Sequence, residues 1–217
     1  FPTRRSSDLL IKEESQYYKL LDLFLYEKFY DTLRTKEALG YIVLTSKTFI
    51  MEIAHLEFII QSKVQNPEYC SERIKIFLKE KEKEIKEITD EEFNTLVKSL
   101  LVEETRKDID LDEQFERNWD EIALKSYKFN IKEENAEYLK KCTKEGFIQF
   151  YEKYIINEPK ILNIEYVCNE HWKDNEIKLK EKNIESNTII FNKVSDFHDC
   201  NSLYPCFYNT YFRQINS

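Results

Sequence analysis

The sequence predicts an α+β fold in which several helices cover one face of an antiparallel sheet. Three patterns indicate it: apolar residues recur at three- and four-residue steps before position 40, two β-rich runs follow, and helix-starting signals then repeat as far as position 143. A chain of 217 residues can bury roughly 70% of its unfolded surface as one domain. We therefore expect one main domain, with a helical layer on a small sheet.

The first expected element is a helix from about Leu10 to Leu39. Its apolar stripe consists of Leu20, Leu21, Phe24, Leu25, Phe29 and Leu33. Gly40, one of only two glycines in the chain, comes next. Glycine often ends a helix in the left-handed conformation because it has no Cβ. Such a stop would aim the Tyr41 side chain at a fixed point beside the helix end.

Two strands are expected next, over residues 41–46 and 50–62, with a turn at 46–48. Along the second strand the even positions are apolar except for Glu52, whereas the odd positions are mixed. Because successive side chains alternate between faces, the even face should carry the helices and the odd face should meet a cavity or a partner. His55 lies on the odd face, where we expect a structural histidine.

The rest of the main domain is predicted to be helical. Its helix-starting signals are Asn66-Pro67, Thr89 with Glu92, Asp110 with Glu113, Asn130 with Glu133, and Thr143. The alternating charges of residues 79–86 are typical of a solvated helix face. Pro159 should end the last helix, and the apolar pattern of 160–169 predicts a third strand.

The chain is expected to divide into four segments. Residues 1–9 fit no later pattern and predict a non-native or disordered leader, and residues 10–170 form the α+β domain. Residues 171–187 predict a charged surface connection. Residues 188–217 predict a C-terminal strand and an extended tail that packs on the domain, since this segment is too aromatic to remain solvated.

Charge and composition exclude several classes of protein. The net charge is −8 with both signs interleaved, so a nucleic-acid-binding face is not expected. The sequence has no run of about 18 apolar residues, so no membrane span is predicted, and no signal peptide is recognisable. The five cysteines follow no framework, which indicates reduced thiols and a cytoplasmic protein.

Residues 29–43, FYDTLRTKEALGYIV, and 56–62, LEFIIQS, carry a resemblance to a known family. Both closely resemble the C-terminal domain of the insulysin (insulin-degrading enzyme) family, the inverted-motif zinc metallopeptidases of family M16. The resemblance continues more loosely over roughly residues 10–217. It implies the half-domain fold that M16 peptidases share with LuxS-like metallohydrolases. It also implies a strand ahead of the first helix, which is missing here, so we expect an N-terminally truncated domain with a bare sheet edge.

The resemblance also implies the site. The arginine and tyrosine of the family's L-R-T-K-E-x-L-G-Y run correspond to Arg34 and Tyr41, which would contact the substrate and stabilise the transition state without binding metal. The family's H-x-x-E-H zinc motif is absent: at the nearest pair, Glu170-His171, the first ligand position holds Val167. Zn²⁺ would therefore belong to the full-length enzyme, held by its N-terminal half, with no metal and no activity in this chain alone. The implied partners are that N-terminal half and short unstructured peptides, and a homodimer remains open.

Other interpretations stay open at this point. A peptidase-like domain can serve as a non-catalytic scaffold or peptide-binding module. Arg34 could be merely solvated, and Tyr41 could be a buried strand residue that bonds locally. A structural zinc could be held by Cys168 with His171, or by the cluster His198, Cys200 and Cys206, although only the first pair has a familiar spacing.

Overall fold

The computed structural model describes residues 7–50, 53–123 and 127–166. The chain divides into two compact units, residues 1–164 and 165–217, and every helix and strand described lies in the first. In order these are α1 Ser7–Phe29, the π-helical turn η1 Tyr30–Lys36, β1 Ile42–Ile50, β2 Ile53–Gln61, α2 Pro67–Lys86, α3 Asp90–Thr105, α4 Leu111–Ala123, α5 Ile131–Leu139, α6 Lys144–Tyr151, and a second π-helical turn, η2 Glu152–Asn157.

The two strands form an antiparallel hairpin whose register runs from Ile42 opposite Gln61 to Ile50 opposite Ile53. The predicted turn at 46–48 is therefore wrong, because these residues pair with Glu57, Leu56 and His55 inside the sheet. The run around them contains no glycine, proline or asparagine that would force a turn. Strand pairing instead continues as far as Ile50 opposite Ile53, and residues 51–52 lie outside the described part.

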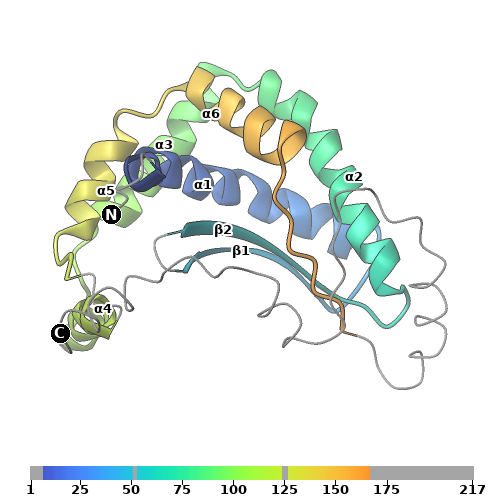
Figure 1. Ribbon diagram of the computed structural model, residues 1–217, viewed down its shortest axis with the longest axis horizontal. Helices are drawn as coiled ribbons and strands as arrows, with labels where there is room; N and C mark the ends of the chain where they lie inside the picture. Colours follow the sequence, from blue (N-terminus) through green and yellow to red (C-terminus); the bar gives the residue numbers. More distant parts are fainter. Residues whose placement is uncertain (1–6, 51–52, 124–126, 167–217) are drawn as a thin grey trace, which may run out of the picture. The chain divides into compact units, whose positions relative to one another are not determined.

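One face of the hairpin is buried, as the alternation predicted. Val43 and Thr45 are buried on β1, and Leu56, Phe58 and Ile60 of β2 pack against the core. Figure 1 shows α1 lying along this face, with α2 and α6 beyond it. The α+β fold, with helices covering one face of an antiparallel sheet, is confirmed.

The core is built around α1. The fully buried side chains of α1 and η1 contact α3, α5 and α6 as well as both strands. The buried apolar residues are Leu20, Leu21, Leu25, Phe29, Leu33, Leu39, Val43, Phe77, Ile85, Ile88, Phe93, Leu100, Leu139, Phe147, Phe150 and Tyr151. Burying one such aliphatic or aromatic side chain stabilises the fold by about 1.5–3 kcal/mol.

Most of the predicted helix starts are confirmed by their caps. Asn66 accepts a hydrogen bond from Tyr69 N at 2.8 Å, and Asp110 accepts one from Glu113 N at 2.9 Å. Two more caps are confirmed. Thr89 and Glu92 form a capping box, in which the side chain of each accepts a hydrogen bond from the backbone N–H of the other, and the Thr143 side chain accepts one from Gly146 N. The cap predicted at Asn130 is wrong: the Asn130 backbone is not extended, and its side-chain amide donates to Glu134 instead of accepting a backbone hydrogen bond.

The end of the first helix also differs from the prediction. The α-helix stops at Phe29 rather than Leu39, and a π-helical turn follows. The left-handed residue is Ala38, at φ 51°, and not Gly40. At its start, α1 includes Ser7 to Leu9 of the predicted leader, and residues 1–6 lie outside the described part.

The predicted third strand is not found over 160–166, where the chain follows no regular element. The rest of that strand, the connection 171–187, the tail 188–217 and the candidate ligands Cys168, His171, His198, Cys200 and Cys206 lie outside the described residues. Within residues 7–50, 53–123 and 127–166, no helix is long and apolar enough to span a membrane.

Candidate functional site

Arg34 of η1 and Tyr41, just before β1, lie next to each other. The guanidinium carbon of Arg34 is 5.7 Å from the centroid of the Tyr41 ring, within the range of a cation–π contact. Tyr41 is 79% exposed and Arg34 is half-buried. The interpretation of Tyr41 as a buried strand residue is therefore wrong. The structure instead presents a cation and a phenol together on an open surface.

The position of Arg34 depends on the π-helical turn. Glu37 N donates to Thr32 O, five residues earlier, at 3.0 Å, and Leu39 N donates to Leu33 O at 2.9 Å. Leu33 and Leu39 are buried, so the turn is fixed to the core on both sides of Glu37. Single π-helical turns are frequent at functional sites, because the wider turn redirects the side chains that follow it.

The position of Tyr41 depends on a close approach between two backbones. Tyr41 N donates to Gln61 O at 3.0 Å, which ties it to the end of β2. A Cβ on Gly40 would overlap this same carbonyl, lying 2.8 Å from its carbon. Glycine is needed here for space and not for a left-handed conformation. The sequence identified the right glycine, but the reason inferred for it was wrong.

A partly buried ion pair joins this segment to α2. Arg73 Nε donates to Glu37 Oε2 at 2.9 Å and Arg73 Nη2 to Glu37 Oε1 at 2.5 Å. The two side chains are only 13% and 28% exposed, and the hydrogen bond to Glu37 raises the pKa of Arg73. The sequence analysis missed this pair. No local signal could have revealed it, because the partners are 36 positions apart.

The face of the hairpin that points away from the core is partly open. Ile42 and Ile59 are 37% and 42% exposed, and Leu44 pairs with Ile59 on the same face. His55 is exposed further along this face, opposite Thr48. Arg34 and Tyr41 offer hydrogen-bond donors that suit a backbone carbonyl, and the open face of the hairpin offers a short apolar strip.

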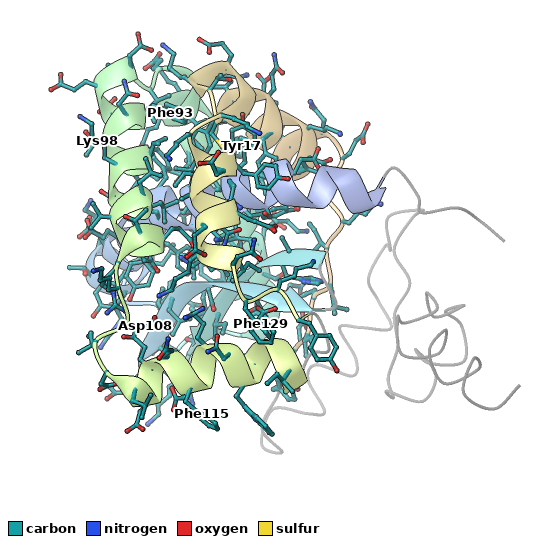
Figure 2. All side chains as sticks on the ribbon, turned by 90° about the vertical axis from the view of Figure 1, so that its left-hand side faces the viewer. Tyr17, Phe93, Lys98, Asp108, Phe115 and Phe129 are labelled. Carbon is teal, nitrogen blue, oxygen red and sulfur yellow. The ribbon has the colours of Figure 1, made fainter. Side chains whose placement is uncertain are left out.

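A second charged cluster lies far from this site along the chain, at the connection from α3 to α4. Asp108, labelled in Figure 2, accepts from Arg117 Nη2 at 2.9 Å and from Lys132 Nζ at 2.8 Å. The hydrogen bond from Arg117, followed by that from Lys132, lowers the pKa of Asp108 to about 2. This cluster links α4 to α5, with both cations bound to the one carboxylate.

Helix α4 carries exposed apolar side chains. Phe115 and Trp119 stack with ring centroids 6.0 Å apart, and both are more than half exposed. Figure 2 shows Phe115 on the outer side of α4.

Among residues 7–50, 53–123 and 127–166, no three His, Cys, Asp or Glu side chains lie close enough to hold a metal ion.

Comparisons with known proteins agree with the sequence pattern. A family profile described as "PQQ synthase PqqF-like, C-terminal lobe domain 4" matches residues 20–119. Insulin-degrading enzyme of Homo sapiens is 34% identical over 149 residues, which are 69% of this chain and 14% of that protein. Insulin-degrading enzyme of Drosophila melanogaster is 29% identical over 192 residues, 86% of this chain and 19% of that protein.

More distant similarities extend the comparison. A nardilysin-like protein of Arabidopsis thaliana is 25% identical over 82% of this chain and 18% of its own length. The crystal structure of pitrilysin superposes with a TM-score of 0.58 at 22% identity, covering 65% of this chain and 15% of that one, and so supports the fold alone. The chain thus spans less than a fifth of each of these proteins.

Proposed function

Since this chain is homologous to the C-terminal region of the insulin-degrading enzymes of peptidase family M16, we propose that it supplies Arg34 and Tyr41 to the cleavage site of a zinc metalloendopeptidase. The observation that carries the proposal is the contact of these two side chains on an open surface. The contact places two hydrogen-bond donors where both can reach one substrate group.

The proposed chemistry concerns the carbonyl oxygen of the peptide bond that is cut. Negative charge builds on this oxygen as the carbonyl carbon becomes tetrahedral. The Tyr41 hydroxyl would donate a hydrogen bond to it, and the Arg34 guanidinium would donate a charge-assisted bond to it or to the neighbouring peptide backbone. A donor aimed at a developing oxyanion is worth about 2.7–4 kcal/mol, or 10²–10³ in kcat.

The proposed substrates are short, unstructured peptides that a chamber can enclose. The partly exposed Ile42 and Ile59 on the open face of the hairpin support an extended peptide lying along that face. The remaining chamber walls, the zinc ligands and the general base would come from the N-terminal half of the same enzyme. This chain would then be inactive by itself.

The test is Tyr41→Phe in the full-length polypeptide that contains this chain, assayed with a fluorogenic peptide. Loss of the hydroxyl should lower kcat by about 10²–10³ and leave KM nearly unchanged, because the bond forms mainly in the transition state. Tyr30→Phe is the matched control: Tyr30 begins η1 and is 50% exposed, and its loss should leave both constants unchanged.

An unchanged kcat in Tyr41→Phe would refute the catalytic role. If Tyr41→Phe and Arg34→Ala also weakened the binding of an uncleaved peptide without affecting any cleavage, the scaffold or peptide-binding interpretation would replace it. The two interpretations are thus separated by whether the variants affect turnover or only affinity.

A further inference from the structure

We propose that the ion pair between Glu37 and Arg73 is a positioning device that holds Arg34 and Tyr41 at their mutual distance. The proposal rests on the proposed function for its catalytic consequence, but its structural part can be tested independently. Glu37 lies between Arg34 and Tyr41 in the chain, so the effect of the pair would be exerted through the segment 34–41.

Glu37 lies at the point where the segment changes direction. Its backbone N–H is bonded to Thr32 O at the end of η1, and the left-handed Ala38 follows directly. Its carboxylate is held from the side by Arg73 of α2 through two short bonds. Position 37 is therefore fixed by its backbone and by its side chain at once, three residues after Arg34 and four before Tyr41.

The remaining anchors leave little freedom elsewhere. Leu33 and Leu39 are buried in the core, and Tyr41 N is bonded to Gln61 O. Without the ion pair, the Glu37 side chain would lose its attachment to α2. Only the backbone bonds and the buried leucines would then hold the turn at Ala38. The exposed segment could then rotate, and the contact between Arg34 and Tyr41 would be lost for part of the time.

The two-point contact between Arg73 and Glu37 fixes the relative orientation of the two side chains. The guanidinium binds the carboxylate through two nitrogens, which fixes orientation as well as distance. Arg73 Nη2 also reaches Glu80 at 3.3 Å, while its Nη1 is buried and makes no hydrogen bond in the described structure. Removing Glu37 would thus leave a mostly buried guanidinium with only one weak partner.

A matched control lies in the same turn. Lys36 binds Asp31 at 2.7 Å, but the two side chains are 67% and 53% exposed. Exposed pairs contribute little to structure, because solvent screens them and their side chains stay mobile. Asp31→Asn therefore removes an ion pair from η1 without removing an anchor.

The experiment uses Glu37→Gln, Arg73→Gln, the charge-swapped double variant Glu37→Arg/Arg73→Glu, and Asp31→Asn, all in the full-length polypeptide. Hydrogen exchange of the amides of residues 37, 39 and 41 reports the segment directly. Each single variant should accelerate this exchange by about tenfold or more, since a lost charge-assisted bond shifts the opening equilibrium by that factor. The swapped pair should recover part of the protection, and Asp31→Asn should match the wild type.

Peptide cleavage then tests the consequence. The single variants should lower kcat by about 10–10²-fold with KM nearly unchanged, since displacement of catalytic groups by about 1 Å has such an effect. A general loss of stability would instead lower the amount of active enzyme equally in all assays, and active-site titration corrects for it.

The outcomes separate the two proposals. Unchanged exchange in Glu37→Gln and Arg73→Gln overturns the positioning role, even if Tyr41→Phe lowers kcat and so supports the proposed function. Accelerated exchange with an unchanged kcat, in an enzyme that Tyr41→Phe inactivates, also overturns it. If Tyr41→Phe has no effect, the proposed function fails, and the exchange data alone decide whether the pair holds the segment.

Discussion

The two π-helical turns, η1 and η2, have the same backbone hydrogen-bonding pattern but lie in different tertiary environments. Each extends an α-helix and ends with a hydrogen bond to a carbonyl five residues earlier, Glu37 N to Thr32 O at 3.0 Å and Glu158 N to Lys153 O at 2.9 Å. In η1 Leu33 is fully buried, whereas η2 has no buried residue. After η1 the chain enters a strand, and after η2 the residues up to 164 form no regular element.

The difference shows that the wide turn does not define a site by its backbone alone. At η1 a core leucine, an ion pair to α2 and a backbone bond to β2 surround the contact between the half-buried Arg34 and the exposed Tyr41. In η2 the aromatic Tyr154 rests on Phe150, with centroids 4.9 Å apart, and its hydroxyl bonds to Glu14 of α1. The first turn presents groups to solvent, and the second attaches the end of a helix to its neighbour.

The largest expected effect comes from the buried side chain that distinguishes the turns. Leu33→Ala should lower the free energy of unfolding by about 2–5 kcal/mol, because a fully buried leucine leaves a cavity. Ile155→Ala in η2, where the isoleucine is only partly buried, should cost about half of that or less. Urea unfolding followed by circular dichroism measures both. Equal losses would show that the two turns are anchored equally.

A smaller effect should follow from adding one methyl group at each glycine. Gly40→Ala must push the backbones of β1 and β2 apart, because the new Cβ overlaps the Gln61 carbonyl, and should cost about 1–3 kcal/mol. The Cβ of Gly146→Ala in α6 instead meets the Tyr17 side chain, which accepts a hydrogen bond from Thr143 N and stacks on Phe150. Tyr17 must shift, but a side chain yields more readily than a backbone and alanine's helix propensity offsets part of the cost, so Gly146→Ala should cost less than Gly40→Ala.

The Gly40→Ala variant also tests the site. Displacement of the strand end should expose the Tyr41 amide, so its hydrogen exchange should accelerate while that of the α6 amides stays unchanged. If Gly40→Ala were as stable as Gly146→Ala and kept the Tyr41 amide protected, the close approach would not be what fixes Tyr41.

Features that depend on a few neighbouring residues could be predicted from the sequence. Thr89 and Asn66 cap their helices because each needs only an extended backbone and an amide three residues ahead. Asn130 has the same signature, but its backbone at φ −102° and ψ 27° is not extended, and the cap does not form. The residue type permits a cap, and the path of the incoming chain decides whether it forms.

Features that depend on distant partners could not be predicted. The role of Gly40 is set by Gln61, and the path after Arg34 is set by Arg73, and neither partner leaves a periodic or local signal. The predicted turn at 46–48 was wrong for a related reason, since pairing with residues 55–57 extends the strand through polar positions. The contact of Arg34 with Tyr41 was expected from the family resemblance, and periodicity alone would not have indicated it.

The smallest effect concerns pH and affects η2. Burial, and to a lesser degree the bond to Glu14, raises the pKa of Tyr154 above its ordinary value of 10.0, although Lys153 acts in the opposite direction. The folded state therefore keeps the phenol neutral where the unfolded chain begins to lose its proton. The stability that this contributes is complete below about pH 10 and is lost as the pH rises through the folded pKa. Tyr154→Phe should make the alkaline fall in the free energy of unfolding shallower. Urea unfolding between about pH 9 and 11 measures this slope. An unchanged slope would mean that the Tyr154 phenol is not what attaches η2 to α1.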